Sequence, residues 1–190
     1  MGAHQDGARL HAETVEQWRN WLVDNHADAA GVWLVSWKRA TGRPRISYEE
    51  SVLEALTVGW IDSLANTLDD ERSMLWFSPR KPDSGWSRPN KERVALLERD
   101  GRMLPAGGNS VELAKTNGSW TALDDIENLV VPADLAEALT AQGAWANWEG
   151  FPRSTKRAIL VWISQTKAAT TRANRIADAA EKAGRGERAR

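Results

Sequence analysis

The sequence of 190 residues contains no cysteine. This absence excludes disulfide bonds, thiolate zinc sites and a cysteine nucleophile, and it fits a reducing compartment, so we expect a cytoplasmic protein. No apolar run approaches the roughly 20 residues that a membrane-spanning helix needs. The first residues, MGAHQDGARL, lack the basic and then apolar pattern of a secretory signal, which argues against secretion.

Aromatic residues other than tryptophan are scarce, since one tyrosine and two phenylalanines stand beside eleven tryptophans. We expect most of these large flat side chains in the core and a few at a binding site. The overall net charge of −1 argues against general affinity for nucleic acids.

The charge is distributed unevenly along the chain. Residues 1–150 carry 15 Lys and Arg against 23 Asp and Glu, a net charge of −8, whereas residues 151–190 carry 10 against 3, a net charge of +7. Two interpretations follow: a basic tail docked on an acidic body, or a basic surface for an anionic partner.

Hydrophobic patterning predicts an α+β fold, with a small antiparallel sheet packed with helices and then a helical C-terminal portion. Residues 32–37, VWLVSW, are apolar on both alternating faces, as in a central strand. Capping-box patterns predict helices that begin after Thr14 and Ser47. Residues 60–68 and 73–78 predict a hairpin around a polar turn.

The second half of the chain reads as helical, with helices predicted from Pro132 to Gly143 and over 152–165 and 170–183. Pro105-Ala-Gly-Gly is predicted to be a loop, followed by one or two helical turns. We therefore expect a flexible tail over 1–13, an α+β core over 14–118 and a helical region over 119–190 that packs on this core.

Four stretches resemble the YdeI/OmpD-associated, or bacteriocin-protection, family. They are GVWLVSWKRATGRPRISYEESVLEALTVGWIDS, FSPRKPDSGWSRPNKERVALLERDGRMLPAG, PRSTKRAILVWI and TKAATTRANRI. Together they run over nearly the whole chain from about Thr14. One departure is Ser63, where the family usually has glycine, so the local turn there is expected to differ. The resemblance implies a bacterial role in envelope stress or resistance to antimicrobial peptides, and it implies no particular reaction.

Asp62 is the candidate catalytic residue, because it is an isolated carboxylate in an otherwise apolar segment. In a strand it would share a face with Trp60. A carboxylate beside tryptophan in a sheltered site would serve as a general acid or base. The alternative is a structural aspartate that pairs with an arginine or caps a turn.

A second candidate group follows the predicted hairpin and has the composition of an anion site. Its members are Arg80, Lys81, Trp86, Ser87, Arg88, Asn90 and Arg93. If Ser87 caps the next helix, the free N–H groups and nearby cations would hold a carboxylate or phosphate, and Trp86 would stack on a flat ligand. The spacing of Asn90 and Arg93 places both on one helix face. The alternative is a solvated loop with surface ion pairs.

Three further residues are expected near the same site, each with a plain structural alternative. Tyr48 lies in the first turn of its helix, where packing with the hydroxyl at the surface is the alternative. Lys38 and Arg39 follow the first strand, where the alternative is a solvated strand end.

Known cofactor and metal motifs are absent from the sequence. His4, His11 and His26 lack the spacing of a metal site, so no metal is expected. There is no GxSxG motif, P-loop lysine or dinucleotide fingerprint, so we expect no cofactor. Gly107-Gly108 is interpreted as a turn.

Three functions remain open. The first is a binding or stress-associated protein that holds an anionic or aromatic small molecule near Asp62, Arg80 and Trp86. The second is a cofactor-independent enzyme of a biosynthetic or detoxification pathway, with Asp62 as acid/base in the same pocket. The third is a protein-interaction module whose basic C-terminal helices, through Arg172 and Arg175, contact an acidic partner.

Overall fold

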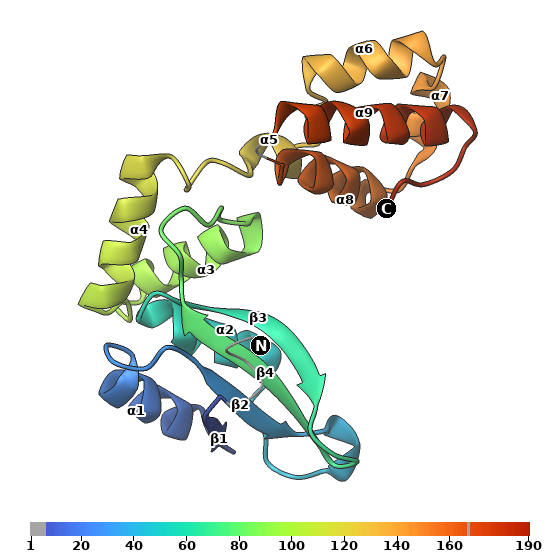
Figure 1. Ribbon diagram of the computed structural model, residues 1–190. Coiled ribbons are helices and arrows are strands. Elements are labelled where there is room, and N and C mark those ends of the chain that lie inside the picture. The colour runs from blue at the N-terminus through green and yellow to red at the C-terminus, as the bar shows by residue number, and fades with distance from the viewer. Residues whose placement is uncertain (1–6, 167) are drawn as a thin grey trace. The chain divides into compact units, whose positions relative to one another are not determined.

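The computed structural model describes residues 7–166 and 168–190. The chain forms two compact units (Figure 1). The first, which we call the sheet unit, ends at Thr121, and the second, the helical unit, runs from Ala122 to Arg190. The predicted α+β class is confirmed.

The sheet unit is built on a four-stranded sheet with the strand order β1-β2-β4-β3. Its strands are β1 (Arg9–His11), β2 (Val32–Trp37), β3 (Trp60–Thr67) and β4 (Arg72–Pro79). The predicted hairpin is present as β3 and β4. The sheet is mixed and not purely antiparallel as expected, because β1 pairs with β2 in parallel.

Strand β1 lies within the expected N-terminal tail, which is a correction to that expectation. Leu10 pairs with Leu34 in the sheet and packs against the core, and Ala12 is fully buried. A three-residue strand carries too little alternation to be seen in the sequence. Residues 1–6 of the expected tail lie outside the described residues.

Four α-helices and one short 3₁₀ helix are described in the sheet unit. They are α1 (Val15–Asn25), η1 (Arg39–Thr41), α2 (Tyr48–Thr57), α3 (Arg88–Arg99) and α4 (Pro105–Asn117). Both predicted capping boxes are formed, with Thr14 and Gln17 at α1 and with Ser47 and Glu50 at α2. Each box satisfies backbone N–H groups that the first helical turn leaves without partners.

Helix α4 corrects the prediction of a loop at Pro105-Ala-Gly-Gly. Pro105 opens the helix, where its missing N–H costs nothing, and Gly107 is buried inside it. A Cβ atom at Gly107 would lie 2.3 Å from the carbonyl oxygen of Thr57 and 2.7 Å from that of Leu56. Glycine at this position therefore permits α4 to touch the backbone at the end of α2.

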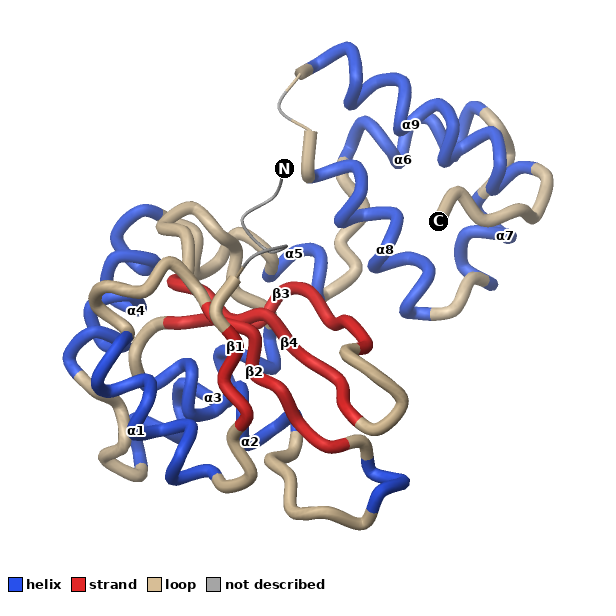
Figure 2. The backbone as a smooth tube through the Cα atoms, turned by 60° about the horizontal axis from the view of Figure 1, so that its bottom comes forward, coloured by secondary structure: helices blue, strands red, loops and turns tan. Residues whose placement is uncertain are grey.

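The main core lies between one face of the sheet and the helices (Figure 2). Val32, Leu34, Trp60 and Phe77 of the sheet pack there with buried residues of α1, α2, α3 and α4. The other face carries Trp33, Val35, Met74 and Trp76, and the rings of Trp33 and Trp76 lie 5.4 Å apart. Trp76 is thus on the opposite side of the sheet from Trp60.

A buried carboxylate joins three segments of the sheet unit. The side chain of Glu54 on α2 is only 2% exposed, and it accepts hydrogen bonds from Arg19 of α1 at 2.8 and 2.6 Å. Arg102, from the α3–α4 connection, donates to the same carboxylate at 2.5 Å. The hydrogen bond to Glu54 raises the pKa of Arg19. This cluster holds α1 and the start of α4 around α2.

The helical unit has its own core and five described helices. They are α5 (Asp124–Glu127), α6 (Ala133–Ala141), α7 (Trp145–Gly150), α8 (Arg153–Ser164) and α9 (Ala169–Gly184). Leu135, Leu139, Trp148, Ile159 and Ile163 are among its buried residues. The three predicted C-terminal helices are present as α6, α8 and α9, which confirms the helical C-terminal portion.

The positive charge of residues 151–190 is largely balanced by acidic residues of the same helical unit. Residues 122–150 add six acidic and no basic side chains, so the unit as a whole has a net charge of +1. Arg172 of α9 pairs with Asp134 of α6 at 2.7 Å, and Arg157 of α8 pairs with Glu127 at 2.8 Å. Arg175 donates to the carbonyl oxygen of Trp162.

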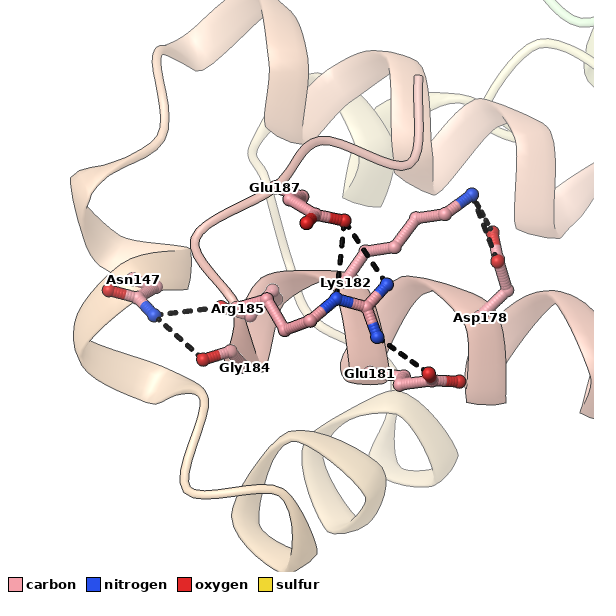
Figure 3. Close-up of polar contacts among 8 residues, drawn as sticks. Asn147, Asp178, Glu181, Lys182, Gly184, Arg185 and Glu187 are labelled. Atoms are coloured by element: carbon pink, nitrogen blue, oxygen red, sulfur yellow. Dashed lines mark hydrogen bonds and ion pairs between the residues drawn. The ribbon is translucent and has the colours of Figure 1, made fainter.

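Polar side chains also cap the C-terminal end of α9 (Figure 3). Arg185 bridges Glu181 at 2.6 Å and Glu187 at 3.1 Å. Asn147 of α7 donates to the carbonyl oxygens of Ala183 at 2.8 Å and Gly184 at 3.3 Å. These bonds satisfy carbonyl groups that the last helical turn leaves without partners.

Candidate functional site

A cavity of about 500 Å³ lies where β2, β3 and β4 meet the 38–46 loop and the start of α2. Leu34, Ile46 and Leu75 give it apolar walls. Tyr48, Asp62 and Lys38, three of the residues singled out in the sequence, all line it.

A β-bulge presents Asp62 to the cavity. Asp62 pairs with Phe77 and Ala65 pairs with Leu75. Between these two pairs β3 advances by three residues and β4 by two, so β3 contains one extra residue. A bulge bends its strand and redirects side chains. Ser63, the departure from the family pattern, lies in this bulge, and among the described non-glycine residues only Leu129 has a positive φ. Serine at position 63 is therefore unstrained.

Tyr48 and Asp62 form a hydrogen-bonded pair at the cavity. The hydroxyl of Tyr48 donates to Oδ2 of Asp62 at 3.0 Å. Burial and then the negative charge of Asp62 raise the pKa of Tyr48, so the phenol remains a donor at neutral pH. Within residues 7–166 and 168–190, Asp62 forms no ion pair, unlike the arginine-paired aspartate that was the alternative.

Arg93 of α3 lies beside the Tyr48 ring, and its guanidinium is bound to other side chains. Its guanidinium donates to Glu49 at 2.9 and 2.5 Å and to Oδ1 of Asn90 at 2.7 Å. It also lies 5.9 Å from the centre of the Tyr48 ring. The hydrogen bonds to Glu49 raise the pKa of Arg93. Asn90 and Arg93 do face the same way, as predicted, but Arg93 donates to both Asn90 and Glu49.

Cations of the loop that follows β2 also line the cavity. The ammonium of Lys38 donates to the carbonyl oxygen of Asp69 at 2.8 Å, which fixes it to the β3–β4 turn. Arg39 and Arg45 also line the cavity and are exposed. In the part of the chain that the structure describes, neither arginine has an ion-pair partner.

Arg45 and Trp37 are cavity residues that sequence reasoning did not select. Trp37 lies under the guanidinium of Arg43, 4.2 Å from the ring centre. Its indole N–H donates to Glu13 at 2.8 Å. The available signal was the density of cations in KRATGRPR, residues 38–45, directly before the capped start of α2.

The structure places Trp86 and Arg80 elsewhere. Trp86 is 1% exposed, and the Arg80 guanidinium stacks on it at 3.9 Å. Arg80 also donates to the carbonyl oxygens of Ser84 and Gly85. Burial lowers the pKa of Arg80 to about 10. These contacts make Arg80 the residue that organises the loop before α3.

The remaining members of the predicted group do not line the cavity either. Ser87 is the N-cap residue of α3 but makes no side-chain capping hydrogen bond. Lys81 and Arg88 are exposed. Trp60 is 1% exposed and donates to the carbonyl oxygen of His26 at 3.3 Å. Trp60 and Arg80 border a separate hollow of about 300 Å³ beside α4.

Within 7–166 and 168–190, no three His, Asp or Glu side chains are grouped so as to hold a metal ion. None of the helices in this part of the chain is both long and apolar enough to cross a membrane.

The architecture defined above is an α+β sheet unit followed by a separate helical unit, and two family models divide the chain at nearly the same place. Residues 10–110 match the model described as a domain of unknown function, DUF8412. This match covers just over half of the chain, which therefore belongs to that family.

The helical unit matches a different model. Residues 128–186 match the family described as "Bacteriocin-protection, YdeI or OmpD-Associated". The resemblance seen in the sequence is thus supported over the C-terminal part of the chain, whereas its first two stretches fall in or near the DUF8412 match. No curated protein and no solved structure matches the chain.

Proposed function

We propose that the protein binds a small molecule with an anionic group in the cavity lined by Tyr48, Asp62 and the 38–46 loop. The observation that carries this proposal is the presence of Arg39 and Arg45 at the cavity without ion-pair partners among the described residues. The cavity volume of about 500 Å³ is in the range of small-molecule sites.

The chemistry of the cavity walls supports this choice of ligand. A guanidinium presents a planar fork of donors that matches a carboxylate or a phosphate. The apolar walls at Leu34, Ile46 and Leu75 would cover a hydrophobic part of the ligand. The proposed ligand site therefore keeps Asp62 from the sequence prediction, and Arg39 and Arg45 replace Arg80 and Trp86 as its other residues.

The test is isothermal titration calorimetry with inorganic phosphate, benzoate and N-acetyl-leucine. We expect binding of at least one of these anions, weakened about tenfold or more in Arg39→Gln and in Arg45→Gln, because a hydrogen bond to a charged group contributes about 1.5–3 kcal/mol. Arg99→Gln is the matched control, since Arg99 is an exposed arginine of α3 that pairs with Asp100 and does not line the cavity. Binding that persists in both cavity variants would contradict the proposal.

A second function is favoured by one specific observation, the hydrogen bond between Tyr48 and Asp62. A carboxylate positioned at a cavity next to a phenol that retains its proton is suited to proton transfer without a cofactor. We propose this chemistry as the alternative role of Asp62. Turnover of a bound substrate should then disappear in Asp62→Asn while binding and melting temperature are retained, and unchanged turnover would refute it.

The biological setting is proposed from the match of residues 128–186 alone. Its description supports a role in protection against bacteriocins. We expect a strain that lacks the gene to be more sensitive to a bacteriocin, and the wild-type gene but not the Arg39→Gln/Arg45→Gln double variant to restore resistance. If both genes restore resistance equally, the protective role does not depend on ligand binding in the cavity.

A further inference from the structure

The cavity carries unpaired charges of both signs. Asp62 presents a carboxylate from the bulge of β3, and Arg39 and Arg45 present guanidiniums from the loop after β2. In the described residues none of the three forms an ion pair, with one another or with another side chain. The cavity lining thus offers a negative group from β3 and positive groups from the loop after β2; the part of the lining at Asp62 is called the negative side and the part at Arg39 and Arg45 the positive side.

The negative side has capacity for a further donor. An ionised carboxylate offers about four lone-pair sites on its two oxygens. The Tyr48 hydroxyl uses one of them, on Oδ2 of Asp62, and no hydrogen bond within the described chain uses Oδ1. The two arginines that interact electrostatically with Asp62 both donate to other groups, Arg93 to Glu49 and Asn90 and Arg80 to backbone carbonyl oxygens of its own loop. A ligand ammonium would therefore meet an available carboxylate.

The volume of the cavity suits a ligand of about two residues. A sphere of about 500 Å³ is roughly 10 Å across, and an extended peptide spans about 3.3–3.6 Å per residue. Two residues with a free amine and a free carboxylate fit this span. Between the charged sides lie Leu34, Ile46 and Leu75, which suit apolar ligand side chains.

We propose that the ligand of this cavity is a zwitterion of dipeptide size with apolar side chains. Its ammonium lies at Asp62 beside Tyr48, and its carboxylate lies between Arg39 and Arg45. This inference rests on the proposed anion site and adds the requirement for a positive charge at the other end of the ligand.

The test compares three peptides that share the leucyl-leucine body and differ in which end is blocked. Leucyl-leucine carries both charges, N-acetyl-leucyl-leucine only the carboxylate, and leucyl-leucine amide only the ammonium. In calorimetric titrations at neutral pH we expect leucyl-leucine to bind about tenfold or more tightly than either blocked peptide, since each charge-assisted hydrogen bond contributes to affinity.

Variants then assign each charge to one side of the cavity. In Asp62→Asn, leucyl-leucine should fall to the affinity of the acetylated peptide, while the acetylated peptide keeps its affinity. In Arg45→Gln, leucyl-leucine and the acetylated peptide should both weaken, while the amide is unaffected. Because an α-amino group loses its proton near pH 7.7–8.0, the advantage of leucyl-leucine over the acetylated peptide should also vanish by about pH 10 in the wild-type protein.

The outcomes separate this inference from the broader proposal. Equal affinity for leucyl-leucine and its acetylated form would overturn the zwitterion and leave the anion site standing. If none of the three peptides binds, the zwitterion proposal is also wrong. The titrations with phosphate, benzoate and N-acetyl-leucine test the anion site independently. Binding of the amide as tight as that of leucyl-leucine would show that the cations do not contribute.

Discussion

Two adjacent glycines of α4 should respond in opposite ways to the same substitution. At Gly107 a Cβ atom would lie 2.3 and 2.7 Å from the carbonyl oxygens of Thr57 and Leu56. At Gly108 nothing lies within 4 Å of the added atom. Both positions are inside one helix, so alanine brings the same gain in helix propensity of about 0.5–1 kcal/mol at each.

The difference between the two variants isolates the contact between α4 and the end of α2. Gly108→Ala should stabilise the protein by about 0.5–1 kcal/mol. Gly107→Ala must add the cost of overpacking against backbone that cannot rotate away, about 1–3 kcal/mol. Gly107→Ala should therefore melt below Gly108→Ala by roughly 2–12 °C, at about 2–4 °C per kcal/mol for a chain of this size.

Thermal melts followed by circular dichroism, with urea titrations for the free energies of unfolding, measure this pair. Because the chain has two compact units, the transition of the sheet unit is the relevant one. If Gly107→Ala proves as stable as Gly108→Ala, then α4 does not rest on the carbonyl oxygens of Leu56 and Thr57, and the explanation for Gly107 is wrong.

Three further predictions concern charged and polar contacts. Glu54→Gln should lower the free energy of unfolding by about 2–3 kcal/mol in urea titrations, because it leaves Arg19 and Arg102 without their shared buried carboxylate. The control Glu98→Gln, at an exposed position, should change this free energy little. The hydrogen bonds from Arg172 lower the pKa of Asp134. This ion pair therefore stabilises the protein at pH values above the ordinary aspartate pKa of about 3.9, and its contribution is lost as the pH falls through the lowered pKa. Melts of Asp134→Asn should show a smaller acid-induced loss than wild type, and an unchanged acid profile would contradict the linkage. Tyr48→Phe removes the hydroxyl that donates to Asp62, so melting should shift by only about 1–3 °C while the affinity for leucyl-leucine changes.

Local sequence signals were sufficient where a structure is encoded by neighbouring residues. The capping boxes at Thr14 and Ser47 mark the starts of α1 and α2 because the side chains and the N–H groups that they satisfy are three residues apart. The continuous apolar run VWLVSW identified β2 as a strand with a neighbour on each side, which β1 and β4 provide.

Features that depend on distant segments were not predictable in the same way. The two glycines after Pro105 are typical of a loop, yet Gly107 is glycine because the end of α2 approaches it. The three residues of β1 form a strand only because β2 offers them an edge. In each case the deciding contact comes from a segment distant in sequence, which local propensity does not record.

The residues of the candidate site were likewise predictable only in part. Tyr48 and Asp62 were both selected from the sequence, and the fold brings them to 3.0 Å. Arg80 and Trp86 have the residue types of a ligand site, but Trp86 is buried and the Arg80 guanidinium stacks on it and binds the carbonyl oxygens of its own loop. Which aromatic residues line a cavity depended on the hairpin register and on the bulge after Asp62, which the sequence does not specify.

The measurement that tests the central claim most directly is NMR chemical-shift mapping of the labelled protein during titration with N-acetyl-leucyl-leucine. The account predicts that the perturbed backbone amides cluster at Ser36, Arg39, Tyr48 and Ser63, around the cavity at the end of the sheet. Perturbations confined to the hollow beside Arg80 and Ser110, or to the helical unit, would contradict it.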